Sequence, residues 1–366
     1  MKRRLDKKAS IRELALELGV STATVSRALN NSPSVSEETK ARVLELADQA
    51  GYMPRVGQRF RNVVGLVYPS NPVLPEFGSF ESALLTGVMK GLDADRYDLA
   101  LIDIERDRAK NESYTQFFRR KGVRGVIIRP VSPEPTIAEA IAEDGFPCVM
   151  VADRSEHPSL GFVCSDSGRD SCRAVDHLIH LGHQRIALVC HTVLDSDHRD
   201  RVSGYRQALA DHAIENDKAL ELFHPASMEG GAQALDRLLS LENPPTAIFL
   251  TNPVPTVGLL HRCLELGIRV PDDLSIVGFD DSDVRSRTYP KFSAVCQNAE
   301  QFGYDAARWL TRRLEGTETG VLRIHRPTTL QFNRSTGPAP EKPVRLASNR
   351  SDVIRVEFPK RGRNKP

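Results

Sequence analysis

Residues 10–30 read Ser-Ile-Arg-Glu-Leu-Ala-Leu-Glu-Leu-Gly-Val-Ser-Thr-Ala-Thr-Val-Ser-Arg-Ala-Leu-Asn, and this stretch decides how the fold begins. The Ser-x-x-Glu spacing at its start has the capping-box form that precedes a helix. Gly19 suits the left-handed position that ends such a helix, and Ser21 can cap a second helix over 22–29. Two short helices around a glycine turn are typical of a helix-turn-helix, whose second helix enters the major groove of DNA.

A third helix is expected after the break at 30–33, which reads Asn-Asn-Ser-Pro. It begins at Ser36 and carries the apolar residues Val43, Leu44, Leu46 and Ala47. Three helices can then share a small core. The pattern alone leaves open a three-helix packing module that binds no nucleic acid.

The charge of the chain is uneven, although its net value is only +2 over 366 residues. Residues 1–61 carry 12 Lys and Arg against 7 Asp and Glu, and residues 337–366 carry 8 against 3. Both ends are therefore basic. A charged segment is commonly just a solvated face, so the helical motif carries the prediction and the charge only agrees with it.

The composition indicates an ordinary globular protein of two or three domains, with 40% hydrophobic and 27% charged residues. We expect a cytoplasmic protein without a membrane contact, because no leader-like or membrane-spanning apolar run stands out. The six cysteines form no C-x-x-C pair, which favours buried free thiols over a zinc site. His180 and His183 lie at the expected end of a helix, where capping is favoured over metal binding, and we expect no metal or cofactor.

From residue 62 onward, short apolar runs alternate with segments of helical periodicity, which predicts parallel sheets with helices on both faces. The expected strands are 63–68, 98–102, 125–128, 148–151, 186–190, 247–250 and 275–279. Polar segments follow several of these strands, for example at 68–72 and 129–130. Open α/β sheets bind ligands at the carboxyl ends of their strands, so we expect a ligand site there.

The N-terminal sequence closely resembles the LacI family of bacterial repressors. The resemblance is carried by Ala9-Ser10-Ile11, by the run 19–30, by Val-Ser-Glu-Glu-Thr at 35–39 and by Gly-Tyr-Met-Pro at 51–54. It implies that Thr22 and Ala23 choose the operator sequence and that Arg27 contacts base edges or phosphate. The chemistry agrees, because a guanidinium can pair with guanine, while a hydroxyl and a methyl group suit other base edges.

Other polar residues of this module are expected to hold its register on the DNA backbone. Ser21, Thr24, Ser26 and Asn30 are interpreted as phosphate or capping positions. Thr24 and Ser26 fit equally well as plain helix surface.

The segment after Pro54 departs from the family. Where the family has a leucine that wedges into the minor groove, this chain has Arg61, and the linker before the first expected strand is several residues shorter. Arg59 keeps its family position, and Phe60 is an alternative apolar wedge against DNA. Gly57 lowers the helix propensity of the segment.

The rest of the chain resembles the effector domain of the same family, and the two resemblances together cover about nine-tenths of the sequence. The motifs are Asp166, the run 177–187, Arg201-x-x-Gly204-Tyr205, Asn252 and the run 270–281. The fold class implied is a small all-α helix-turn-helix module followed by a two-lobed α/β body of the periplasmic-binding-protein type. The expected domains are 1–52 for the DNA-binding module, 53–62 for the hinge, 63–335 for the body and 336–366 for a flexible basic tail. The first lobe is expected at about 63–163 and 293–320, and the second at about 164–292 and 321–335.

The resemblance also implies an effector site between the lobes. The residues assigned to it are Ser70, Arg129, Asp153, Arg201, Asn252, Asp280 and Gln297. Their hydrogen-bonding groups suit a sugar, which offers hydroxyls that both donate and accept, and a nucleobase uses similar groups. Two alternatives stay open: Asp280 and Asp281 can cap the following helix, and Arg201 can pair with Asp197 or Asp200 on its own helix.

The sequence thus predicts a ligand-responsive transcriptional regulator, a repressor, that binds a pseudo-palindromic operator in double-stranded DNA as a homodimer or tetramer. A small effector, a sugar or a nucleobase, is expected in the body. The alternative is a cytosolic binding protein for a sugar or purine whose N-terminal module binds protein instead of DNA. No enzymatic activity is expected, because no nucleophile elbow or phosphate-binding loop follows a strand.

Overall fold

The computed structural model describes residues 10–29, 32, 34–50, 52, 62–68, 78–130, 136–348 and 354–358. Its N-terminal module consists of α1 (Ile11–Leu18), α2 (Thr22–Leu29) and α3 (Glu37–Gln49). The three helices bury a core of their own, in which Leu14, Val25 and Val43 are at most 1% exposed. The predicted small helical module is confirmed.

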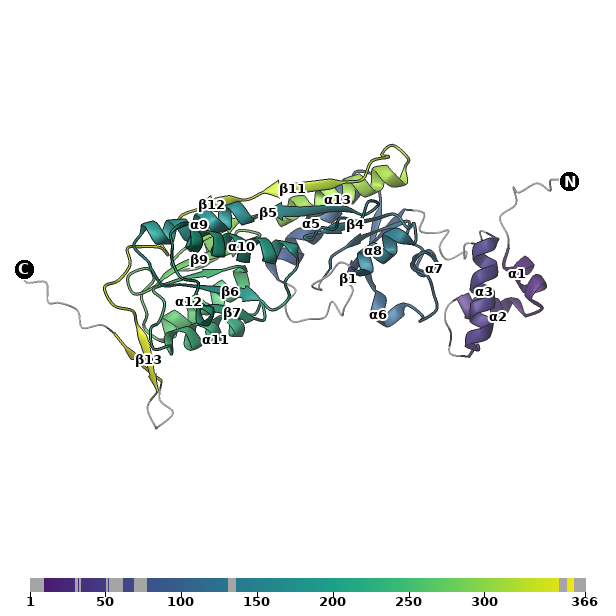
Figure 1. Cartoon of the computed structure of the whole chain (residues 1–366). Coiled ribbons are helices and arrows are strands. Elements are labelled where there is room, and N and C mark those ends of the chain that lie inside the picture. Colours follow the sequence, from purple (N-terminus) through teal and green to yellow (C-terminus); the bar gives the residue numbers. More distant parts are fainter. Residues whose placement is uncertain are drawn as a thin grey trace, which may run out of the picture.

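The first lobe of the body is built on a six-stranded sheet (Figure 1). The strand order is β11 (Arg323–Pro327), β5 (Gly161–Asp166), β4 (Cys148–Val151), β3 (Gly125–Ile128), β1 (Val63–Tyr68) and β2 (Asp98–Asp103). All neighbouring strands in it are parallel. The strands therefore end at one common edge, which meets the second lobe.

Helices cover both faces of this first sheet. They are α5 (Ser79–Asp93), α6 (Ile104–Asp107), α7 (Tyr114–Arg120), α8 (Thr136–Glu143) and α13 (Ala299–Leu314). The helices α5 and α13 share one buried cluster with the sheet, and α7 and α8 share the other. At Gly87 a Cβ would lie 1.7 Å from the carbonyl oxygen of Glu300, so glycine is required where α5 meets α13.

The second lobe has its own six-stranded sheet. The strand order is β12 (Thr329–Gln331), β10 (Ser293–Cys296), β9 (Ser275–Asp280), β8 (Ala247–Leu250), β6 (Ile186–His191) and β7 (Glu221–His224). Within this sheet, the described pairings are parallel except for the antiparallel β10–β12 pair. Along β6, Ile186 and Leu188 pack on one face and Ala187 and Val189 on the other, as expected for a strand buried on both sides.

The second lobe also has helices on both faces. They are α9 (Gly168–His180), α10 (Ser196–Asp211), α11 (Met228–Leu239) and α12 (Pro253–Glu265), with short 3-10 helices at η1 (Lys218–Leu220) and η2 (Val284–Arg287). The pair α9 and α10 packs on one face, and the pair α11 and α12 packs on the other. Within the described ranges, no helix is long and apolar enough to cross a membrane.

The chain passes between the lobes three times. The crossings follow β5, β10 and β11, and Figure 1 shows β11 and β12 running along both lobes. The expected lobe boundaries shift accordingly: β10 pairs with β9 and belongs to the second lobe, whereas β11 pairs with β5 and belongs to the first. Strand pairing between distant segments decides this membership, and local sequence does not encode it.

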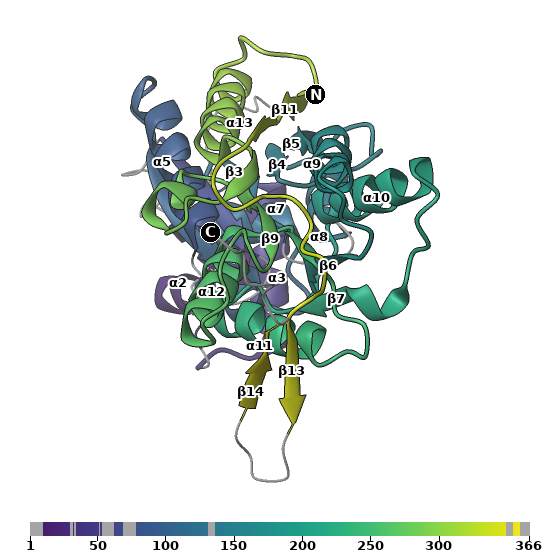
Figure 2. The ribbon, with the colours of Figure 1, turned by 90° about the vertical axis from the view of Figure 1, so that its left-hand side faces the viewer.

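The C-terminal segment corrects the expectation of a flexible basic tail over 336–366. Its described part forms a hairpin of β13 (Arg345–Ser348) and β14 (Ile354–Glu357), which lies beside α11 in Figure 2. Val344 and Leu346 are 2% and 7% exposed and pack into the core of the second lobe. The physical reason is the alternation of apolar and charged residues, which gives the segment one apolar face that the lobe buries.

Candidate functional site

The recognition helix α2 is held by local capping. Ser10 and Glu13 form the predicted capping box at the start of α1, and Gly19 ends that helix with φ of +67°. The Oγ of Ser21 then accepts a hydrogen bond from the Thr24 amide at 3.0 Å and lies 2.8 Å from the Thr24 Oγ1. The two helices are therefore positioned by side chains within the motif itself.

The residues predicted to read DNA form the outer surface of α2. Thr22, Ala23 and Arg27 are exposed, whereas Val25, Ala28 and Leu29 on the opposite face are buried in the module. Residues four apart lie on the same face of a helix, so Ala23 and Arg27 present one continuous surface.

The other predicted DNA contacts divide into two groups. Ser21 is exposed, while Thr24 and Ser26 are half-buried at the side of the same helix. Asn30, Arg59 and Phe60 lie outside the described residues. The contacts of Ser21 and Thr24 are thus those of a cap at the start of α2.

At the boundary between the lobes, the first turn of α10 meets the ends of the first-lobe strands. The Ser196 amide donates to the Asp153 carboxylate at 3.0 Å, just after β4. The hydroxyl of Ser165, on β5, donates to Asp197 at 2.8 Å. Because these bonds join side chains of one lobe to the helix terminus of the other, they fix how the two lobes meet.

Two ion pairs reinforce this contact between the lobes. Arg129, directly after β3, lies 3.7 Å from the Asp195 carboxylate. Arg154 forms a two-pronged ion pair with Asp200 through both of its terminal nitrogens. The predicted residues Arg129 and Asp153 therefore do lie at the lobe boundary.

Arg201 is the centre of the second-lobe half of the site, and it is 3% exposed. Its guanidinium stacks on the ring of Phe279, with 3.6 Å from its central carbon to the ring centroid. One terminal nitrogen donates to the Thr251 carbonyl at 2.6 Å, and the other donates to Gln297 Oε1 at 3.3 Å. The Asp197 carboxylate lies 4.0 Å away, so the predicted alternative of pairing within α10 is present as a loose contact.

Asp280 makes the contacts of the capping alternative, and its effector role stays a prediction. Its carboxylate accepts from the amides of Val284 and Arg285 and from the Arg285 guanidinium. The neighbouring Asp281 lies beside the predicted effector residue Gln297 and accepts a hydrogen bond from its Nε2 at 2.5 Å. The tight turn after β9 decides which of two adjacent carboxylates points to the lobe boundary, and the sequence motif does not.

Asn252 joins the same network through a histidine. It precedes α12 and makes no side-chain cap there. Its Oδ1 lies 3.2 Å from His198 Nε2, and the other ring nitrogen of His198 lies 2.7 Å from Asp195. The predicted residues Arg201, Asn252 and Gln297 are thus brought together, while Ser70 lies outside the described residues.

Burial sets the protonation of the carboxylates in this network. Burial raises the pKa of Asp281 to about 6, which Arg201 and the hydrogen bond from Gln297 only partly offset. Burial also raises the pKa values of Asp153 and Asp197 above the usual range of a carboxyl group. Burial opposes ionisation of Asp195 too, but His198 and Arg129 outweigh it, and its pKa lies below that range.

Several buried polar atoms of this network have no hydrogen-bond partner among the described residues. They include Asp153 Oδ2, Ser196 Oγ, Asp197 Oδ1 and Arg201 Nε. Buried polar groups are normally satisfied, because an unpaired one carries a desolvation cost. Acceptors and a donor left open at one boundary suit a small polar ligand.

Sequence reasoning assigned no ligand role to four residues of this network: Ser165, Asp195, Asp197 and His198. For the three residues on α10 and its cap, the signal was present as the segment Leu-Asp-Ser-Asp-His-Arg-Asp-Arg at 194–201, a few residues after the predicted strand 186–190. Its density of charged residues at the start of a helix is unusual for a structural cap. Their burial, at 8% exposure or less for Asp195, Asp197 and His198, appears only in the folded chain.

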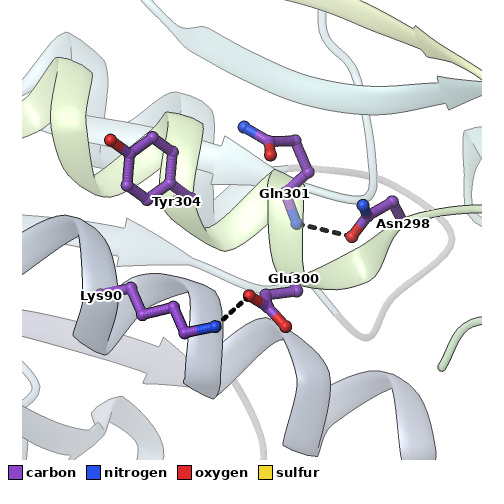
Figure 3. A pocket seen from close by; sticks show the side chains of 5 residues that line it. All are labelled: Lys90, Asn298, Glu300, Gln301 and Tyr304. Atoms are coloured by element: carbon purple, nitrogen blue, oxygen red, sulfur yellow. Dashed lines mark hydrogen bonds and ion pairs between the residues drawn. The ribbon is translucent and has the colours of Figure 1, made fainter.

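A separate hollow of about 320 Å³ lies where α5 meets the start of α13 (Figure 3). Lys90 and Glu300 form an ion pair of 2.6 Å there, and Asn298 accepts from the Gln301 amide at 3.0 Å. None of the predicted effector residues lines this hollow. Two of its charged groups, Lys90 and Glu300, are already paired with each other.

Comparisons with known proteins agree with both regions. Residues 10–55 match the family model of bacterial regulatory proteins, lacI family, and residues 175–336 match that of a periplasmic binding protein-like domain. The probable HTH-type transcriptional repressor ExuR of Bacillus subtilis (strain 168) is 31% identical over 320 residues, which cover 86% of this chain and 94% of the relative. The HTH-type transcriptional regulator DegA of the same organism is 29% identical over 342 residues, covering 90% and 99%.

Solved structures show the same fold. The transcriptional regulator CelR–cellobiose complex is similar with a TM-score of 0.63 and 26% identity, over 89% of this chain and 99% of that one. A LacI family transcriptional regulator from Enterococcus faecium with bound ribose has a TM-score of 0.65 and 26% identity, over 76% and 99%. By its two matched domains and its identity to these relatives, the chain belongs to the lacI family of bacterial regulatory proteins and is a DNA-binding transcriptional regulator with a ligand-binding body.

Proposed function

We propose that this regulator is a repressor that binds a pseudo-palindromic operator as a homodimer, and that a small polar effector at the lobe boundary sets its operator affinity. The observation that carries the proposal is the surface of α2. Thr22, Ala23 and Arg27 are exposed on a helix whose opposite face is buried and whose start is capped. A short helix with one exposed polar face and one buried apolar face is suited to lie in a major groove.

Dimerisation follows from the size of the module. One eight-residue helix reads few base pairs and binds weakly, whereas two linked copies gain affinity through their effective concentration. The operator is then expected to have two half-sites related by the symmetry of the dimer. A tetramer would join two such dimers and leave the contact of each module unchanged.

The effector is proposed to bridge the two lobes where α10 meets β4 and β5. Polar atoms without partners lie on both sides of this boundary, on Asp153 of the first lobe and on Asp197 and Arg201 of the second. The relatives solved with cellobiose and with ribose make a sugar the first class to test. A ligand that bonds both lobes would change how they meet, and the lobes carry the DNA-binding modules.

The family relationship does not favour the alternative of a binding protein whose N-terminal module contacts another protein. The proposal includes no catalytic step, and it places the protein where the DNA is, in the cytoplasm. The contacts assigned to Asn30, Arg59 and Phe60 remain predictions within it.

The direct test is selection of DNA from a random pool by the purified full-length chain, followed by binding measurements at increasing salt. We expect a pseudo-palindromic consensus, and a slope of log affinity against log salt that reports several phosphate contacts per dimer. Sugars that raise the melting temperature should then change operator affinity in the same assay. Recovery of no consensus sequence would reject operator recognition, whereas a consensus insensitive to every stabilising sugar would reject only the effector part.

A further inference from the structure

The carboxylates at the lobe boundary are not balanced by cations. Asp153, Asp197 and Asp281 are at most 7% exposed, and the Arg201 guanidinium interacts with Asp197 and Asp281. Asp153, after β4, accepts from the Ser196 amide in the first turn of α10, Asp197 lies within that turn, and Asp281 is joined to Arg201 through the Gln297 side chain. Asp197 and Asp281 thus share the positive charge of Arg201, and the buried Asp153 carboxylate adds a further negative charge at the same boundary.

The other charged residues around them already have partners. The pairs are Asp195 with Arg129 and His198, Asp200 with Arg154, and Asp280 with Arg285. No Lys, Arg or His in the described ranges forms an ion pair with Asp153 or Asp281. The excess negative charge therefore stays with the three carboxylates and is available to a ligand.

Unsatisfied acceptors accompany this charge. Asp153 Oδ2 and Asp197 Oδ1 are buried and accept no hydrogen bond of standard geometry from a described residue, and the Ser196 hydroxyl lies beside the Asp153 carboxylate. The Arg201 Nε is an open donor in the same network. The open atoms thus include two carboxylate oxygens, which can only accept hydrogen bonds when the groups are ionised.

We propose that the effector carries a positively charged amino group among its hydroxyls, as an amino sugar does, and that the site rejects anionic sugars such as uronates and sugar phosphates. The inference rests on the proposed function, in which this boundary binds the effector. An ammonium group supplies three donors and the missing positive charge, which is what two open carboxylate oxygens and a hydroxyl require.

Electrostatics gives the proposed selectivity its direction. A buried carboxylate without a cation is disfavoured, and its raised pKa records that cost. An ammonium group removes this cost when it binds, a neutral hydroxyl only donates a hydrogen bond, and a second anion adds repulsion in a medium of low dielectric constant. The expected order of affinity is amino sugar, then neutral sugar, then uronate.

The test measures binding of matched hexoses to the full-length protein by calorimetry at pH 7. The probes are D-glucosamine and D-galactosamine, their parent hexoses, their N-acetyl forms and the corresponding uronates. We expect at least one amino sugar to bind about tenfold or more tightly than its parent, and N-acetylation to abolish this advantage, because it removes the charge. The corresponding uronate should bind at least as weakly as the parent.

Variants locate the effect on the three carboxylates. Asp197→Asn and Asp281→Asn should each reduce the ratio of amino-sugar affinity to parent-sugar affinity by about tenfold. Asp211→Asn is the matched control, because Asp211 is exposed at the far end of the same helix. The comparison among ligands on the unaltered protein needs no variant and stands even where a variant folds poorly.

Three results would overturn the inference: equal binding of amino and parent sugars, tighter binding of a uronate, or stabilisation by Mg²⁺ or Ca²⁺ alone in place of an amine. Binding of none of these sugars would overturn it as well. Selection of an operator is a separate readout, so the inference can fail while repression through α2 is retained. Failure to select any operator would instead reject the proposed function.

Discussion

The DNA-reading helix and the lobe boundary keep their polar side chains in opposite environments. On α2, Thr22, Ala23 and Arg27 are exposed and rest on a core that they do not enter. At the lobe boundary, Asp153 and Arg201 are almost fully buried and bond to the strands and helices that form the lobes.

Because of this difference, function and stability depend on separate residues in the N-terminal module but on the same residues at the lobe boundary. The exposed residues of α2 can be exchanged without disturbing the helix, so operator choice can change while the fold stays. The buried residues of the boundary hold the lobes as well as a ligand, so each change there alters both. Four substitutions test this difference between the two regions. They follow in order of the expected change in free energy, from the largest to the smallest.

Arg201→Ala should have the largest effect on the free energy of unfolding. It leaves the buried Asp197 and Asp281 without the guanidinium that partly compensates them, and breaking a buried ion pair in this way costs about 3–5 kcal/mol. Urea denaturation at pH 7.5 measures the loss. Arg199→Ala, at an exposed site on the same helix, should change stability by less than about 1 kcal/mol. Equal effects of the two variants would show that burial does not set the cost.

Asp281→Asn should stabilise the protein at pH 7.5. The pKa of Asp281 is raised from 3.8 to about 6, so between these values the folded chain binds more protons than the unfolded chain and stability falls as pH rises. Asparagine removes this titration and can still accept from Gln297. The gain should reach at most about 3 kcal/mol at pH 7.5 and vanish near pH 4.

Melting curves of Asp281→Asn and the unaltered chain across this pH range provide the measurement. Asp211→Asn, which replaces an exposed carboxylate, should show no such pH-dependent gain. A stability increase of Asp281→Asn that is the same at pH 4 and pH 7.5 would contradict the electrostatic explanation.

Arg27→Ala should weaken operator binding by about 1–3 kcal/mol and relax base preference, while the free energy of unfolding changes by less than about 0.5 kcal/mol. Fluorescence anisotropy with the selected operator and with unrelated DNA measures both effects. Arg42→Ala removes an exposed arginine from α3 and should leave base preference intact. If Arg42→Ala relaxed preference as much as Arg27→Ala, the reading surface would not be α2.

Ser21→Ala should have the smallest effect, about 1 kcal/mol, because it removes one helix cap. The loss should be confined to the N-terminal module, where amide hydrogen exchange in α2 should accelerate while exchange in the lobes stays the same. Thr22→Ala, one residue further, makes no described capping bond and should leave exchange unchanged. Faster exchange in both lobes would show that the module and the body unfold together.

Much of the fold was predictable because its signals are local. The predicted strands 63–68, 125–128, 148–151 and 247–250 have the bounds found in the structure, since each is a short buried apolar run between turns. Other strands were missed. β11 and β12 expose alternate residues at the lobe edge, and β13 and β14 lie in a segment whose charge suggested disorder.

The candidate effector site was predictable only in part. Arg129, Asp153, Arg201 and Gln297 lie at the lobe boundary as expected, because the carboxyl ends of parallel strands meet there. The exchange of Asp280 for Asp281 was not predictable. It depends on the backbone of the turn after β9, which offers its amides to the first carboxylate and leaves the second facing Arg201.

The sequence by itself determined the N-terminal module, since capping serines, the left-handed Gly19 and the exposed face of α2 depend on residues at most four apart. It also determined the alternation of strands and helices in the body. Only the tertiary structure decided which strands share a sheet, that the C-terminal segment folds onto the second lobe, and that Asp197 and Asp281 meet one arginine at the boundary. These features join residues far apart in the chain, and burial, which sets their charge and their pKa values, exists only once the lobes have closed around them.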